Sequence, residues 1–99
     1  MRSIEVLNMS VIVAGKLILQ SNTRERFLEA SRETVIMARN REDCDDFSVS
    51  ADLLEMDRVN IFEKWKHRAA LEGFRNSGSR PELFSLVTRF QVSEYEVPD

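Results

Sequence analysis

The side chains best suited to chemistry lie in one stretch of alternating sequence, where a carboxylate and an indole stand one residue apart, at Glu63 and Trp65. Alternate residues of an extended strand point to the same side, so we expect Val59 and Ile61 to share this face. A carboxylate among apolar side chains is either a structural charge, paired with an arginine or with backbone groups, or part of a ligand pocket. In the pocket interpretation Trp65 is a wall, and burial raises the pKa of Glu63 so that it can act as a general base.

Two further residues are candidates for proton transfer or substrate contact. His67 is the only histidine of the chain, and we expect it to be exposed near the start of a helix. Asn60 lies on the strand face opposite Trp65 if the alternation is strict, so it reaches the same pocket only through a bulge. The predicted catalytic residues are therefore Glu63, Trp65, His67 and Asn60.

The composition argues against metal, nucleotide and nucleic-acid chemistry. Cys44 is the only cysteine, which excludes a disulfide within the chain and a cysteine-based zinc site. The aspartates lack the spacing of a calcium loop, and no Rossmann or P-loop glycine pattern is present. We therefore predict no metal and no cofactor. The net charge is −3, with 14 basic residues scattered among 17 acidic ones, whereas nucleic-acid binding requires a clustered basic face.

The length and the N-terminal sequence set the expected organisation and location. Ninety-nine residues are enough for one domain, which we place at residues 11–97. Residues 1–10 form an N-terminal extension that either lengthens the first strand or is partly disordered. The longest apolar run, residues 11–14, is far shorter than a membrane span, and the N-terminus lacks a signal-peptide pattern. We predict a cytoplasmic protein with no membrane partner.

The elements that must position the candidate residues follow from the hydrophobic periodicity and the turn residues between periodic segments. The expected order is a strand at 11–19, a helix from residue 24, strands at 47–53 and 59–65, a helix at 67–74, a short helix from residue 81 and a strand at 90–97. Gly15 in the first strand indicates a bulge or a close backbone approach. This order is that of the ferredoxin-like α+β fold, βαββαβ, an antiparallel sheet with its helices on one face.

The sheet face opposite the helices is expected to be apolar. Phe62, Leu54, Tyr95 and several aliphatic residues of the first strand are predicted to lie there. A monomer rarely exposes so large a contiguous apolar area, so a second sheet should pack against it. We therefore predict a homodimer.

Several short patterns follow one another without gaps along the chain. They are Arg24-Glu25-x-Phe27, Glu42-x-Cys44-x-x-Phe47, and Glu63-x-Trp65-x-x-x-Ala69-Ala70-Leu71-Glu72 closed by Phe74. Together they resemble the antibiotic biosynthesis monooxygenase (ABM) domains, the dimeric α+β-barrel group that includes small quinol and anthrone monooxygenases. Phe74 stands where many members have a histidine, and its presence removes the ligand that related haem-degrading members use.

The resemblance implies a cofactor-independent monooxygenase that oxidises a quinol or polycyclic aromatic substrate with O2. Such an enzyme needs an apolar pocket, a base that forms the substrate anion and donors that hold its charge; Glu63 or His67 would be the base. The ligand is expected between the sheet and the helices of each subunit, in contact with Val59, Ile61, Leu71, Phe74 and Phe84. The alternative is a non-catalytic dimeric barrel that binds a hydrophobic ligand or serves as an accessory domain, which the missing histidine favours.

Overall fold

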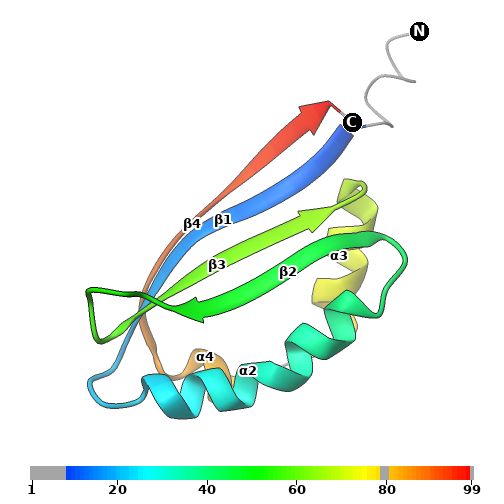
Figure 1. The fold of residues 1–99 in the computed structure, drawn as a ribbon. Helices are drawn as coiled ribbons and strands as arrows, with labels where there is room; N and C mark the ends of the chain where they lie inside the picture. Colours follow the sequence, from blue (N-terminus) through cyan, green and yellow to red (C-terminus); the bar gives the residue numbers. More distant parts are fainter. Residues whose placement is uncertain (1–8, 79–80, 99) are drawn as a thin grey trace, which may run out of the picture.

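The computed structural model describes residues 9–78 and 81–98, and this part of the chain forms a four-stranded antiparallel sheet with its helices on one face (Figure 1). The elements are β1 (Met9–Leu19), α2 (Arg24–Arg39), β2 (Cys44–Ala51), β3 (Arg58–Trp65), α3 (Arg68–Asn76), α4 (Pro81–Phe84) and β4 (Val87–Pro98). The strand order across the sheet is β2-β3-β1-β4. The predicted βαββαβ, ferredoxin-like topology is confirmed.

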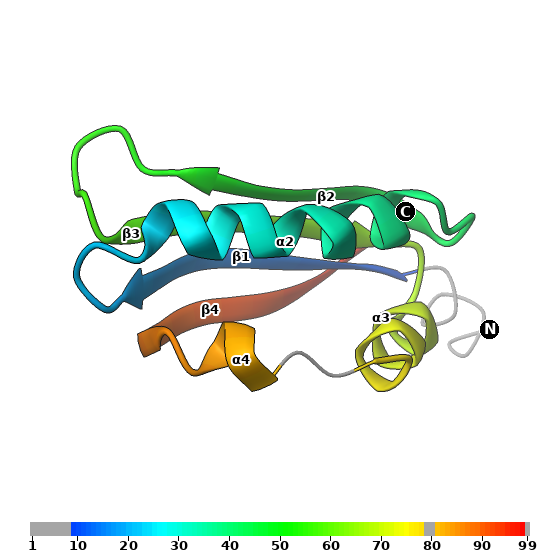
Figure 2. The ribbon, with the colours of Figure 1, turned by 90° about the horizontal axis from the view of Figure 1, so that it is seen from below.

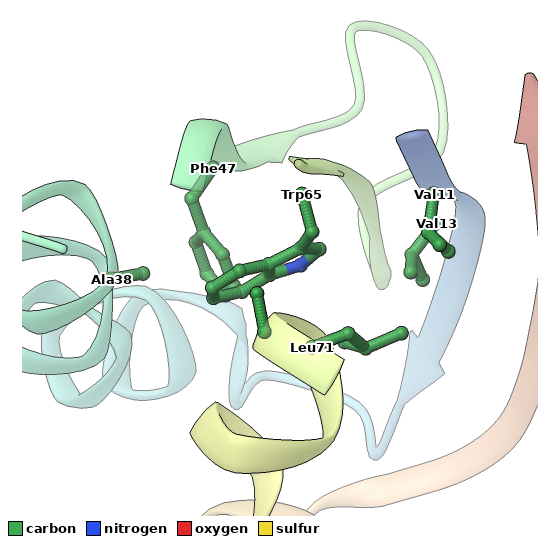
Figure 3. Packing of buried hydrophobic residues seen from close by; sticks show 7 residues of the cluster. Val11, Val13, Ala38, Phe47, Trp65 and Leu71 are labelled. Carbon is green, nitrogen blue, oxygen red and sulfur yellow. The ribbon is translucent and has the colours of Figure 1, made fainter. Parts of the chain in front are cut away.

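The helices form one layer over the sheet. Figure 2, which shows the molecule from the helix side, places α2 along the middle of the sheet and α3 and α4 one after the other on the side of β4. The core between the layers has two clusters of buried side chains. One surrounds Trp65 (Figure 3) and the other contains Leu17, Phe27 and Val59. No helix of the described residues is long and apolar enough to cross a membrane.

The second strand begins at Cys44, three residues before the predicted start at residue 47. The polar residues before Phe47 take part in the ladder, with a register shift between Cys44 and Asp46. Asp45 forms ion pairs with Lys64 (3.4 Å) and Lys66 (2.7 Å). Opposite charges on neighbouring strands stabilise their pairing, so this polar segment continues the strand instead of ending it.

The first strand begins at Met9, so the last two residues of the predicted N-terminal extension belong to it. The rest of the extension, residues 1–8, lies outside the described residues. Within β1, Gly15 has a φ of +155°, a conformation that favours glycine. A Cβ atom at this position would lie 2.2 Å from the carbonyl oxygen of Gln91. The glycine therefore permits a close approach of β4 to β1.

The sheet face away from the helices carries an apolar patch. Phe62 is 37% exposed and Tyr95 is 53% exposed, and β1 lies between them with Ile12 opposite Tyr95 and Ala14 opposite Phe62. Leu54 does not belong to this patch, which corrects the prediction. It lies in the β2–β3 loop and is 87% exposed, because Asp52 ends the strand by accepting the Leu54 backbone N–H at 3.0 Å.

Candidate active site

A cavity of about 480 Å³ lies between the sheet and the helices. Ligand pockets for small organic molecules span roughly 300–1,000 Å³, so this volume is sufficient for a planar aromatic ligand. The walls are mostly apolar and come from all four strands and all three described helices. The lining residues are Val13, Leu17, Phe27, Ser31, Thr34, Met37, Phe47, Val49, Ile61, Glu63, Phe74, Arg75, Ser77, Gly78, Leu83, Phe84, Phe90 and Val92.

Glu63 is the only carboxylate among the described lining residues. Its place in β3, opposite Val13 of β1 and Phe47 of β2, puts the side chain on the helix face of the sheet. Burial raises the pKa of Glu63 above its ordinary value, and the Trp65 hydrogen bond and the Arg75 charge offset this rise in part. A half-buried carboxyl in an apolar cavity, with a raised pKa, is suited to accept a proton from a weakly acidic ligand.

Trp65 holds Glu63 in place rather than lining the cavity. The indole is fully buried, and its Nε1–H donates to Glu63 Oε1 at 2.9 Å. Its ring packs on Phe74 at 5.1 Å and against Phe47 at 6.3 Å between centroids. Figure 3 shows the indole between Phe47 and Leu71. Phe47 and Phe74 line the cavity, and Trp65 supports them from behind.

The structure separates the other predicted catalytic residues from Glu63. Asn60 points to the opposite sheet face, as strict alternation requires, where its Nδ2–H donates to Asp52 Oδ1 at 3.0 Å. His67 is exposed and caps α3, with its Nδ1 accepting the Ala70 backbone N–H at 3.1 Å. Neither residue lines the cavity.

The predicted substrate-binding residues divide into two groups. Ile61, Phe74 and Phe84 line the cavity. Val59 and Leu71 are fully buried in the core and do not reach it. Leu71 belongs to the core cluster around Trp65, whereas Val59 belongs to the second cluster with Leu17 and Phe27.

Arg75 is the one basic residue among the described lining residues, and it was not among the residues predicted from the sequence. Arg75 follows Leu71 by four residues, so helical periodicity places it on the same side of α3. A basic residue in the last turn of a helix is also the usual complement to the helix dipole, so nothing in its sequence position distinguishes Arg75 from an ordinary surface residue. Its Nη2–H donates to Glu94 Oε2 at 2.8 Å.

Two hydroxyl side chains of α2 are also on the cavity wall. Ser31 Oγ–H donates to the Phe27 carbonyl oxygen at 2.8 Å. The Thr34 hydroxyl is buried and has no hydrogen-bond partner among the described residues. The described residues contain no cluster of histidine, cysteine, aspartate and glutamate that could hold a metal ion. A third hydroxyl on the wall, that of Ser77, donates to the Phe74 carbonyl oxygen at 2.7 Å. The polar side chains on the apolar wall are therefore a carboxylate, an arginine and three hydroxyls.

A sequence model of one protein family, described as "Antibiotic biosynthesis monooxygenase", matches residues 10–83. The comparison with curated proteins finds no match.

Solved structures with the same fold span nearly the whole chain. A protein from Shewanella oneidensis is 18% identical, with a TM-score of 0.80, and the alignment covers 90% of this chain and 91% of that one. A protein from Deinococcus radiodurans, provisionally described as an antibiotic biosynthesis monooxygenase, is 20% identical with a TM-score of 0.77, covering 90% and 93%. One from Nitrosomonas europaea with the same provisional description is 12% identical with a TM-score of 0.74, covering 93% and 90%. At these identities the likeness establishes the fold.

Proposed function

The chain belongs to the antibiotic biosynthesis monooxygenase family, and we propose on this basis that it oxidises a quinol or polycyclic aromatic substrate with O2, without a cofactor. The observation that carries the proposal is the position of Glu63. Its carboxyl lines an apolar cavity of about 480 Å³ and has a raised pKa. It is therefore a base placed where a planar aromatic would bind.

The reaction begins with a proton transfer. Glu63 takes a proton from a hydroxyl group of the substrate, and the resulting anion is electron-rich enough to react with O2 directly. For a hydroquinone, one oxygen atom enters the ring and the other leaves as water, which gives a hydroxyquinone. The substrate supplies all four electrons, so the balance needs no added reductant. The protein contributes the base, the positioning and the exclusion of bulk water.

We also propose that the protein works as a homodimer in the cytoplasm, with the apolar sheet faces of two copies packed together. Phe62 and Tyr95, with Ile12 and Ala14 between them, supply the contact surface. Phe62→Asp would bury an unpartnered charge there and should dissociate or unfold the dimer. Light scattering that shows a stable wild-type monomer at micromolar concentration would contradict this assembly.

One observation favours the alternative of a non-catalytic protein that binds a hydrophobic ligand. No histidine lies among the described lining residues, and Phe74 occupies α3 where it meets the cavity. Glu63 is then the sole base at the site, and in this alternative it serves only to fix Trp65.

Oxygen consumption distinguishes the two functions. Purified protein is incubated with a panel of hydroquinones and anthrones, with no added metal, flavin or nicotinamide, and O2 uptake is recorded beside product formation. The monooxygenase predicts protein-dependent uptake with one O2 consumed for each molecule of product, a hydroxyquinone from a hydroquinone and an anthraquinone from an anthrone. Binding of panel members without any uptake above the protein-free rate would favour the ligand-binding protein.

A further inference from the structure

Arg75 is the one positive charge on the wall of the cavity, among the described lining residues. It comes from the last turn of α3, and its side chain is about half exposed, with 48% of its surface accessible. An arginine has five N–H donors, and the described residues use one of them, in the bond to Glu94. Donors remain available for a ligand in the cavity.

The strand register brings Arg75 close to Glu63. Val13 of β1 lies opposite Glu63 of β3 and opposite Glu94 of β4. The two glutamates therefore flank Val13 on the same face of the sheet, about 10 Å apart from backbone to backbone, because neighbouring strands are about 4.8 Å apart. Arg75 is bonded to one of the two carboxylates at 2.8 Å and shares the cavity wall with the other.

Glu94, which holds Arg75 in place, is itself held by a second arginine, Arg68. Glu94 Oε1 accepts from Arg68 Nη1 at 2.9 Å while Glu94 Oε2 accepts from Arg75. The two arginines lower the pKa of Glu94, so this carboxylate stays ionised. Glu94 has two cations beside it, whereas the hydrogen-bond donor to Glu63 is the neutral indole of Trp65. The Glu94 carboxylate thus holds Arg75 at the cavity, and the remaining N–H donors of Arg75 can bind a second negative charge.

We infer that Arg75 binds the deprotonated oxygen of the ligand at the α3 end of the cavity, beside Glu63. This inference rests on the proposed function and narrows its substrate class to planar aromatics that present an acidic phenol or enol at one end of an apolar body. The proton moves from the ligand hydroxyl to the Glu63 carboxylate, and the negative charge moves to the ligand oxygen. The negative charge beside Arg75 is on Glu63 before the transfer and on the ligand oxygen after it, so the net charge of the site does not change.

The structure offers a matched control for this role. Arg68 and Arg75 both donate to Glu94 from α3, but only Arg75 lines the cavity. Arg68→Gln and Arg75→Gln therefore each remove one ion pair from Glu94, and Arg68→Gln also removes the pair with Glu96, so the control loses at least as much charge pairing as the test variant. An effect confined to Arg75→Gln reports on a ligand in the cavity and not on the stability of α3.

The experiment titrates a bound chromophoric phenol, nitronaphthol, whose ionised form absorbs at longer wavelength. All variants carry Glu63→Gln, so the cavity carboxyl does not titrate with the probe. Arg75→Gln should raise the pKa of the bound probe by about one unit, which is a roughly tenfold weaker preference for the anion, because an opposite charge within reach shifts a pKa by that order. Arg68→Gln should leave it unchanged, and affinity for the neutral probe should be equal in all three proteins.

Three results would overturn the inference. They are equal shifts in the two arginine variants, no shift in either, and no binding of the probe. The pKa of the bound probe is measured without O2, so this test can fail or succeed independently of the monooxygenase activity. If Arg75→Gln alone raises the pKa of the bound probe but the wild type consumes no O2 with any quinol, the anion site is supported and the monooxygenase activity is rejected. If the wild type oxidises quinols but Arg75→Gln leaves the pKa of the bound probe unchanged, the monooxygenase activity is supported and anion binding by Arg75 is rejected.

Discussion

Replacing Trp65 by phenylalanine removes the indole N–H that Glu63 accepts at 2.9 Å and leaves the carboxylate in the same half-buried place. A hydrogen bond to a charged acceptor contributes about 1.5–3 kcal/mol. The smaller ring also loses apolar burial beside Phe74, about 1 kcal/mol. We therefore expect Trp65→Phe to lower the free energy of unfolding by about 3 kcal/mol in all, which in a domain of this size lowers the Tm by about 12–24 °C.

A double-mutant cycle separates the hydrogen bond from the packing. Glu63→Met keeps a side chain of similar length and removes the acceptor, so Trp65→Phe in that background should cost only the packing part. Urea unfolding followed by circular dichroism measures all four proteins, since the indole fluorescence is lost in two of them. The coupling between the two sites should be about 1.5–3 kcal/mol at neutral pH.

The same substitution should change the titration of Glu63. The indole hydrogen bond lowers the pKa of this carboxyl against the larger effect of burial. Without the bond, the pKa of Glu63 should rise further, and carbon-detected NMR of labelled protein can follow it. If Trp65→Phe costs the same in both backgrounds and leaves the titration of Glu63 unchanged, then Trp65 does not position this residue.

Three further outcomes follow from the fold and the cavity. Gly15→Ala should lower the free energy of unfolding by about 3 kcal/mol, because the new methyl group meets the backbone of β4, and an alanine protein as stable as the wild type would contradict this close approach. Hydrogen bonds, first from Asn60, lower the pKa of Asp52 to about 2, so the stability contributed by its ionised form should vanish as pH falls from about 4 to about 2. Thermal melts across this range should show a shallower decline in Asp52→Asn than in the wild type. Phe74→Trp should weaken quinone binding by filling the cavity, whereas Phe62→Trp on the other sheet face should not, and quenching titrations that show the reverse would move the site to the dimer face.

The sequence predicted the sheet and the face of Glu63, because strand alternation is a local property. The register confirms that Glu63 and Trp65 share the helix face and that Asn60 does not. The alternation could not distinguish a tryptophan on a cavity wall from one beneath it, since both point to the same side. That distinction depends on how closely α3 packs on the sheet.

Arg75 was not predictable for a related reason. Its place at the cavity results from a contact between α3 and β4, and Glu94 is 19 residues further along the chain. Helical periodicity gives the side of α3 on which Arg75 lies but not what that side faces. The predicted role of Leu54 failed because the strand ends at a turn stabilised by Asp52, where alternation no longer applies.

The sequence left two bases open, and the structure places them differently, with Glu63 in the cavity and His67 exposed at the start of α3. The most direct test of the account is the rate of cofactor-free O2 uptake in Glu63→Gln and His67→Asn, compared with the wild type on the best quinol of the panel. Asparagine preserves the helix cap, so His67→Asn changes the base without removing the cap. We predict that Glu63→Gln lowers kcat by about 10²–10⁴-fold, the usual contribution of a general base, and that His67→Asn leaves it within about twofold. Full activity in Glu63→Gln, or a loss confined to His67→Asn, would contradict the assignment of Glu63 as the base.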